Sequence, residues 1–198
     1  MSQFEFFMTF YGLLLGLAVA ELMAGFANLI GAKARPRLGL FTPLLGFTVF
    51  IQLMATFLDA WLKLQNVAMN LVGLAIPTMI GILFFVLART AVPRETADWP
   101  SLDAYFLAHR RWTVGMLLAI NALIWVYEFP LLRAMIAQEH WSNVRHYFAA
   151  NGVLLALHLV ALFARPRALI AAALAGIALF YLYYYADFAA PIFSAASA

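Results

Sequence analysis

The chain has 198 residues, of which 66% are hydrophobic and 11% are charged, and its formal net charge at pH 7 is +3. Soluble domains carry about 25% charged residues, so this composition excludes an ordinary soluble protein and indicates an integral membrane protein. The sequence contains no cysteine, which excludes disulfide bonds and thiolate chemistry.

The apolar runs predict an all-α bundle of six transmembrane helices that forms one domain over residues 1–198, because a spanning helix needs about 20 residues. The predicted helices cover residues 4–31, 43–65, 67–87, 112–132, 146–163 and 168–191. We expect the first run to be a spanning helix rather than a signal peptide. Its N-terminal flank has no Lys or Arg, and the run is too long for a signal sequence.

The first predicted helix carries small residues at every fourth position, and one acid. The small residues are Gly12, Gly16, Ala20 and Ala24. Such a ridge lets another helix approach closely, so we expect it to pack helices and to form a homo-oligomer. Glu21 has no basic residue within two turns of the same helix, so we expect its partner on another element.

The second predicted helix carries a stripe of polar residues. They are Thr48, Gln52, Thr56, Asp59 and Lys63, with Asn66 and Asn70 continuing the spacing. Steps of three or four residues place these side chains on one face of an α-helix. Asp59 and Lys63 form an i, i+4 pair with the acid first, which is the favourable order. At the start of this helix, Thr42 followed by Pro43 predicts an N-cap and a first helical residue.

The third predicted helix has Pro77 at its centre, where we expect a kink. The region 89–111 that follows is expected to be a long loop. Ser101 is expected to cap a short amphipathic segment within it, which would lie at the cytoplasmic membrane interface.

Polar residues also interrupt the last three predicted helices. They are Asn121 and Glu128 in the fourth, His158 in the fifth and Asp187 in the sixth. Asp59, Glu128 and Asp187 each lie in the outer third of a helix, which predicts carboxylates around an outer mouth; Asp187 alternatively sits solvated at the headgroups. Glu21 and His158 both lie in the inner half, where their contact would make a proton site or a structural pair. The tyrosines of 181–185 are expected to form an aromatic belt and to offer hydroxyls to neighbouring acids.

The distribution of Lys and Arg predicts the orientation. The first, third and fifth connections hold nine of them and the other side holds three, which places those connections in the cytoplasm and both termini outside. We therefore expect a multi-pass protein of the bacterial cytoplasmic (inner) membrane, in contact with the lipid bilayer.

Polar groups at several depths favour a small transporter or channel-like protein that moves a proton, a cation or a small polar solute along the second helix. The alternative is a non-catalytic membrane subunit or scaffold, in which the stripe holds helices or a partner together. An enzyme is the less favoured reading, because no catalytic motif is present. The four histidines have no metal-ligand spacing, so we expect no metal and no cofactor, and the composition gives no reason to expect nucleic-acid binding.

Overall fold

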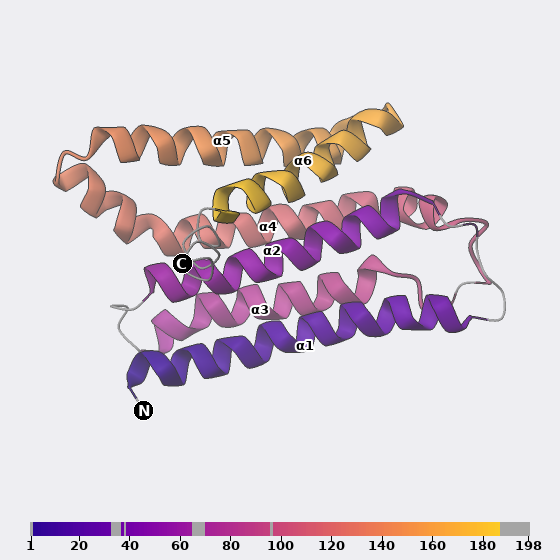
Figure 1. Ribbon diagram of the computed structural model, residues 1–198, viewed down its shortest axis with the longest axis horizontal. Helices are drawn as coiled ribbons and strands as arrows, with labels where there is room; N and C mark the ends of the chain where they lie inside the picture. The colour runs from indigo at the N-terminus through magenta and orange to yellow at the C-terminus, as the bar shows by residue number, and fades with distance from the viewer. Residues whose placement is uncertain (1, 33–36, 38, 65–69, 96, 187–198) are drawn as a thin grey trace, which may run out of the picture.

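The computed structural model describes residues 2–32, 37, 39–64, 70–95 and 97–186. Within these ranges it contains six α-helices and no β-strand (Figure 1). The helices are α1 (Gln3–Gly31), α2 (Phe41–Lys63), α3 (Leu71–Ala91), α4 (Leu102–Ala137), α5 (Trp141–Phe163) and α6 (Arg167–Ala186). All six are long and apolar enough to cross a membrane, which confirms the all-helical class and the number of candidate spans.

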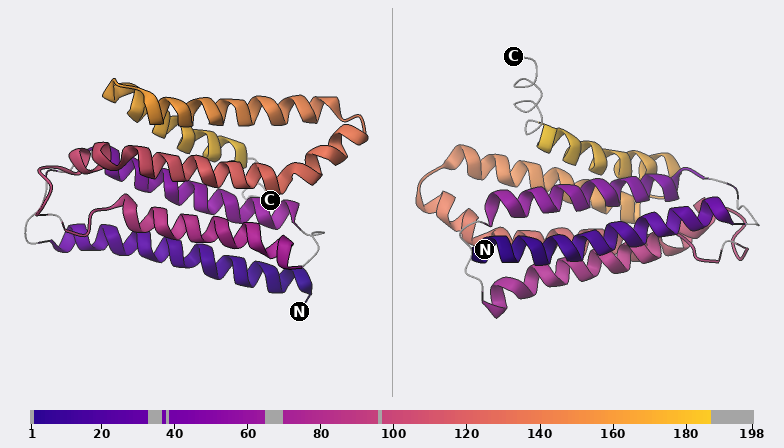
Figure 2. Two further views of the ribbon diagram at one scale, coloured as in Figure 1. Left: turned by 180° about the vertical axis from the view of Figure 1, so that it is seen from behind. Right: turned by 60° about the horizontal axis from the view of Figure 1, so that its bottom comes forward.

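Helix α2 lies at the centre of the molecule. It contacts α1, α3, α4 and α6, and Figure 2 shows it between α6 and α1. In its most apolar stretch 56% of the residues are buried, whereas no other span exceeds 39%. Polar side chains on α2 therefore have to find partners inside the protein rather than in solvent.

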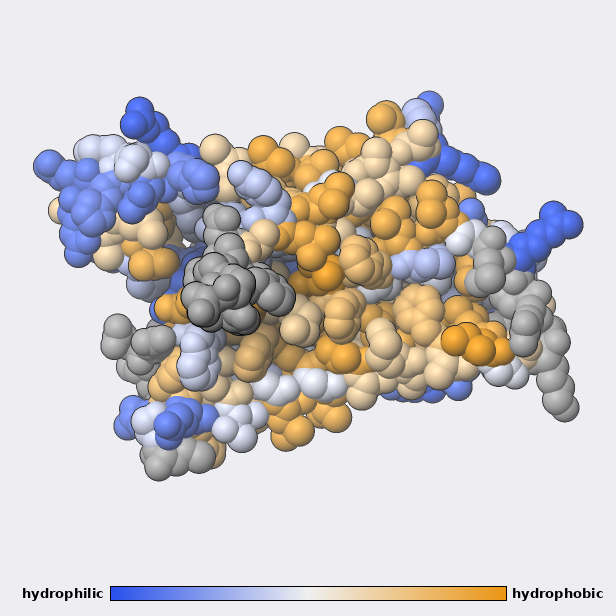
Figure 3. Space-filling model, in the orientation of Figure 1, coloured by the Kyte–Doolittle hydropathy of each residue, from blue (hydrophilic) through white to orange (hydrophobic). Residues whose placement is uncertain are grey.

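The outer surface of the helices is apolar along most of their length. Figure 3 shows orange side chains over the middle of the molecule and blue ones gathered at its two ends. Large exposed side chains include Leu13, Phe47, Phe129, Phe148 and Leu179. This distribution is typical of helices that face lipid, where association depends on close packing rather than on the removal of apolar surface from water.

Helix α4 differs from the prediction of a separate interfacial segment, which is wrong. The helix begins at Leu102 and continues without a break to Ala137. Ser101 does act as its N-cap, because its Oγ accepts a hydrogen bond from the backbone N–H of Ala104 at 3.1 Å. Leu102 is fully buried, and Phe106 stacks on Phe41 of α2 with ring centroids 5.0 Å apart. This packing makes the segment the first turns of α4 rather than a separate element.

The start of α2 also differs from the prediction. Phe41 is the first helical residue, so Thr42 is inside the helix and is not its N-cap. The cap comes from α4, where Asp103 Oδ1 accepts a hydrogen bond from the N–H of Phe41 at 2.9 Å. The hydroxyl of Thr42 instead donates to the carbonyl of Leu102 at 3.0 Å. A side chain 62 residues away in sequence therefore replaces the local cap.

Two further boundaries differ from the prediction. Helix α3 continues to Ala91, four residues beyond its predicted end, and passes through Pro77 as one helix. Helix α5 begins at Trp141, five residues before its predicted start. The predicted end of the sixth helix lies outside the described residues.

Helix α4 also contains an internal proline, Pro130. Proline cannot donate to the carbonyl four residues earlier, and its ring clashes with that turn, so helices bend there. Figure 1 shows the last part of α4 turning away from α2 before the chain enters α5.

Candidate functional site

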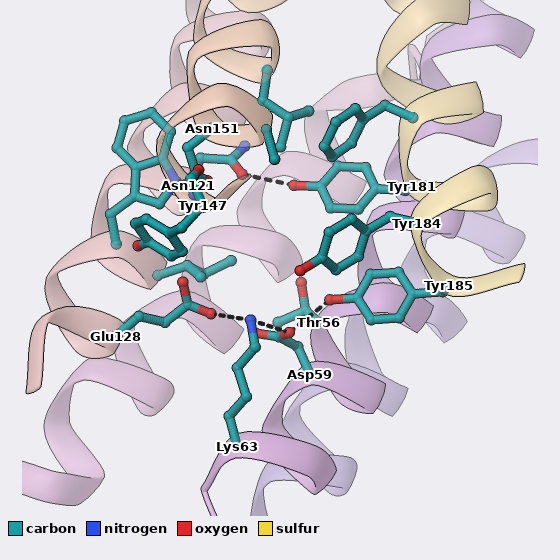
Figure 4. Close-up of a pocket in the computed structure, with 15 residues that line it drawn as sticks. Thr56, Asp59, Lys63, Asn121, Glu128, Tyr147, Asn151, Tyr181, Tyr184 and Tyr185 are labelled. Carbon is teal, nitrogen blue, oxygen red and sulfur yellow. Dashed lines mark hydrogen bonds and ion pairs between the residues drawn. The ribbon is translucent and has the colours of Figure 1, made fainter. Parts of the chain in front are cut away.

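Three charged side chains meet where α2 and α4 face each other, and we call Asp59, Lys63 and Glu128 the charged cluster (Figure 4). Lys63 Nζ lies 2.6 Å from Asp59 Oδ1 and 2.5 Å from Glu128 Oε1. Tyr185 of α6 donates its hydroxyl proton to the same Asp59 oxygen at 2.7 Å. Three helices therefore contribute to one hydrogen-bonded group.

The charged cluster is largely withdrawn from solvent and is not neutral. The side chains of Glu128 and Asp59 are 7% and 14% exposed, and that of Lys63 is 26% exposed. Two carboxylates and one ammonium leave one formal negative charge when all three are ionised. An ionised acid costs about 2.5–3.5 kcal/mol at the centre of a spanning helix and less toward the helix end, where Asp59 and Lys63 lie. The cluster therefore favours the uptake of a proton or of a further cation.

A cavity of about 60 Å³ adjoins the charged cluster, between α2, α4, α5 and α6. Its volume has room for a few water molecules or a small ion, and not for a larger organic molecule. Four tyrosines line it, as Figure 4 shows: Tyr147, Tyr181, Tyr184 and Tyr185. Among the described residues that line it, Lys63 is the only base.

A smaller cavity of about 20 Å³ touches the cluster from the side of α1 and α3. Thr56, Asp59 and Glu128 line both cavities, and Tyr11 and Tyr127 line only this one. This volume is enough for about one water molecule. The two carboxylates therefore lie between two cavities, one with room for a few water molecules and one with room for about one.

Next to the cluster, a second polar network joins α4, α5 and α6. The hydroxyl of Tyr181 donates to Asn121 Oδ1 at 2.7 Å, and Asn121 Nδ2 lies 3.2 Å from Nε2 of the fully buried His158. Nδ1 of His158 lies 2.7 Å from the carbonyl of Leu154. One proton arrangement satisfies all of these contacts. The imidazole is neutral and carries its proton on Nδ1, and Asn121 donates to Nε2.

The predicted polar stripe of α2 turns inward, because Thr48 and Gln52 are fully buried and Thr56 is 7% exposed. Thr48 makes hydrogen bonds to the carbonyls of Leu44 and Leu174, at 2.8 and 3.2 Å. Gln52 is different, because neither its amide nitrogen nor its amide oxygen has a hydrogen-bond partner among the described residues. An unpaired buried amide costs about 1–3 kcal/mol. Gln52 is thus a buried stripe position without a hydrogen bond of normal geometry, and the hydroxyl of Tyr181 is its polar neighbour on α6.

The predicted contact between Glu21 and His158 is wrong. Glu21 Oε1 instead accepts from Arg94 at 2.6 Å and from Arg89 at 3.2 Å, at the end of α3. The prediction that its partner lies on another element is confirmed. His158 is held by Asn121 and by its own helix, so it has no need of an acid.

The small-residue ridge of α1 is divided between two environments. A side-chain carbon at Gly12 would lie 3.3 Å from the ring of Phe57, so this position packs against α2. Gly16, Ala20 and Ala24 are exposed, and the homo-oligomer they predict stays a prediction. The close approach between α1 and α3 instead uses Gly81, where an added carbon would lie 2.9 Å from the side chain of Leu14.

The predicted ring of outer carboxylates reduces to Asp59 and Glu128 in the described part of the chain. Asp187 lies outside the described residues, as does Asn66. Glu5, at the start of α1, is exposed and forms a capping box with Ser2 through hydrogen bonds of 2.7 and 3.1 Å. Its carboxylate therefore stabilises a helix end rather than a site.

Sequence reasoning expected hydroxyl partners for acids from residues 181–185, and the bond between Tyr185 and Asp59 confirms it. It did not identify Tyr11 or Tyr147 as cavity residues. The i, i+4 spacing of Tyr181 and Tyr185 was the available signal, because it places both on one face of α6. No such signal exists for Tyr147, whose position depends on how α5 packs.

No model of a known protein family, no curated protein and no solved structure matches this chain. The chain therefore stands as a protein with six helices that suit membrane spans, and its function has to be argued from the site itself.

Proposed function

We propose that this chain is a small membrane transport protein that takes up a proton or a small monovalent cation at the charged cluster. The observation that carries the proposal is the charge balance, because Asp59 and Glu128 share the single ammonium of Lys63. One negative charge is left within spanning helices, and such a group attracts a proton or a cation. The adjoining cavity of about 60 Å³ gives space for water or an ion of similar size.

In this proposal the ammonium of Lys63 competes with the solute cation for the two carboxylates. The ammonium occupies the position between two carboxylates that a solute cation would take. The lysine belongs to the last turn of α2 and is 26% exposed, so it is able to swing toward the helix end. Uptake of a proton by one carboxylate weakens its hold on the ammonium, which couples the protonation of the cluster to the release of Lys63.

The route from the cluster follows the polar face of α2. Thr56 lines the cavity, and Gln52 follows one turn deeper, where its buried amide has no hydrogen bond of normal geometry. Thr48 comes next, and its hydroxyl is occupied by two carbonyls. In this conformation we therefore take Gln52 as the deepest position reached by the solute and Thr48 as the closed end.

The direct test is flux through the purified chain in lipid vesicles that contain a pH-sensitive dye and a K⁺ gradient. Asp59→Asn and Glu128→Gln are each expected to lower the flux at least about tenfold, the effect of roughly 1.4 kcal/mol. Glu139→Gln is the matched control, because it removes an exposed carboxylate between α4 and α5. Unchanged flux in both cluster variants would show that the proposed roles are wrong.

A scaffold remains the second candidate, and specific contacts favour it. The hydroxyl of Thr48 bonds to a carbonyl of α6, so one stripe residue already joins helices, and the hydroxyl of the nearby Thr42 bonds to a carbonyl of α4. A single cysteine at Gln52, treated with a membrane-impermeant thiol reagent, separates the two candidates because the chain has no other cysteine. Labelling at Gln52 supports a water-filled route. No labelling at Gln52, with labelling of a separate single cysteine at Lys63, supports the scaffold.

A further inference from the structure

A separate hollow lies at the end of α3, and none of its lining residues belongs to the charged cluster. The inference drawn from it does not depend on the proposed transport. The hollow has a volume of about 370 Å³, and we call it the α3-end hollow. Its polar lining consists of Arg89, Thr90, Arg94, Glu95, Asp98 and Tyr105, with Trp99 beside them. An adjoining cavity of about 90 Å³ shares both arginines and reaches Glu21 and Asn28 of α1.

Both arginines form an ion pair with Glu21 and keep N–H donors that this ion pair does not use. Both guanidinium groups pair with the same oxygen of Glu21, at 2.6 Å for Arg94 and 3.2 Å for Arg89. Their side chains are 57% and 48% exposed, whereas that of Glu21 is 21% exposed. A guanidinium carries five N–H donors, and these ion pairs engage one of them on each arginine. The remaining donors suit the oxygens of a phosphate, which arginine binds in a bidentate manner.

The acids and the aromatic ring of the hollow suit a positive group. Glu95 and Asp98 are exposed, and Trp99 packs edge-on against Tyr105 with ring centroids 5.2 Å apart. The hydroxyl of Tyr105 donates to the carbonyl of Thr90 at 2.7 Å, which fixes this wall to α3. Carboxylates beside a tryptophan face are the surroundings in which an ammonium is stabilised.

The charge of the lining selects among headgroups. The two arginines are opposed by Glu95 and Asp98 in the lining and by Glu21 in the adjoining cavity, so the three acids outnumber the arginines by one charge. A purely anionic headgroup would meet these acids unfavourably, whereas a headgroup with one phosphate and one ammonium matches both pairs. The hollow lies at the end of a candidate membrane span and has Trp and Tyr in its wall, which is typical of the level of lipid headgroups.

We infer that the α3-end hollow binds the phosphoethanolamine headgroup of a membrane phospholipid. The phosphate lies against Arg89 and Arg94, and the primary ammonium lies against Glu95 and Asp98, beside Trp99. The same chemistry is found in a lipid and in soluble glycerophosphoethanolamine, and the acyl chains of the lipid extend along the exposed apolar surface of the helices.

The test is native mass spectrometry of the full-length chain in detergent, with phosphatidylethanolamine, phosphatidylcholine and phosphatidylglycerol added at equal concentration. Phosphatidylethanolamine is expected to bind about tenfold more tightly than either other lipid, because only it offers both charged groups with N–H donors. The double variant Glu95→Gln/Asp98→Asn is expected to bind phosphatidylethanolamine and phosphatidylcholine equally. Both substituted side chains are exposed, so the fold does not depend on them.

Two further arms complete the test. Arg94→Gln is expected to weaken all three lipids, whereas the matched control Arg111→Gln, an exposed arginine in α4, is expected to change none. Soluble glycerophosphoethanolamine is expected to displace the lipid, since the headgroup is what the hollow recognises. Equal binding of the three lipids to the unaltered chain, or no displacement by the soluble headgroup, would overturn the inference, because binding would then depend on the acyl chains.

Discussion

At the scale of single residues, the ammonium of Lys63 has two carboxylate partners within 2.6 Å and draws them from two helices. Removing Lys63 leaves two carboxylates without a counter-charge, which costs more than the pairs contributed, whereas removing one carboxylate loses an ion contact but leaves a balanced pair. The exposed fraction of Lys63, 26%, allows solvent to reduce this cost. The coupling energy within the charged cluster is therefore large enough to measure, and the partial exposure of Lys63 lets its side chain rearrange.

A double-mutant cycle measures this coupling. Lys63→Met and Glu128→Gln are each expected to lower the free energy of unfolding, and the double variant is expected to lose less than their sum. We expect a coupling of about 1–2 kcal/mol, which is within the range for residues in one charged network. Thermal unfolding in detergent gives the values, and Glu139→Gln combined with Lys63→Met supplies the uncoupled reference. A coupling below about 0.3 kcal/mol would identify a solvated surface pair.

At the scale of elements, the helices end and begin where tertiary contacts permit. Helix α2 starts one residue before the predicted cap because Asp103 of α4 accepts from the N–H of Phe41. Helix α4 starts at Leu102 because that turn is buried against α2. The contacts between the first turns of α2 and α4 stabilise both helix starts, so we expect these two turns to unfold together.

This mutual capping predicts the effect of changing Asp103. Asp103→Ala removes the acceptor and is expected to lower the free energy of unfolding by about 1 kcal/mol, as for other N-cap replacements. Asp103→Asn retains an oxygen acceptor and is expected to cost less. Thermal unfolding of both variants in the same detergent measures the difference. Equal losses would mean that the charge of Asp103, rather than its hydrogen bond, holds this end together.

At the scale of the whole molecule, six candidate spans separate two ends with different charge. The end that holds Arg89, Arg94 and the connection to α4 carries most of the basic residues, and the other end carries the charged cluster. From this asymmetry the positive-inside rule predicts the orientation, with the more basic end in the cytoplasm. The direction of the proposed transport and the leaflet that would meet the α3-end hollow both depend on the orientation.

Cysteine labelling in intact cells tests the orientation. A cysteine at Ser142, in the first turn of α5, is expected to react with an impermeant reagent added from outside. A cysteine at Ala97, in the connection between α3 and α4, is expected to react only after the cells are permeabilised. Both positions are exposed, so access rather than burial decides the result. The reverse pattern would place both chain ends in the cytoplasm.

The sequence by itself determined the all-helical class, the number of candidate spans found in the described residues and the inward face of α2. Apolar runs of about 20 residues and a spacing of three or four residues are local properties that need no knowledge of neighbours. It also placed Asp59, Lys63 and Glu128 among the candidate residues, because charged groups stand out within apolar helices.

Only the tertiary structure decided which of these groups meet. Glu21 found arginines at the end of α3 instead of His158, and Gln52 was left without a partner while its neighbour Thr48 found Leu174. Helix rotation and pairing set these contacts, and both follow from close packing over the whole molecule. A sequence pattern records the face on which a side chain lies, but the element opposite that face is fixed only when all six helices are in place.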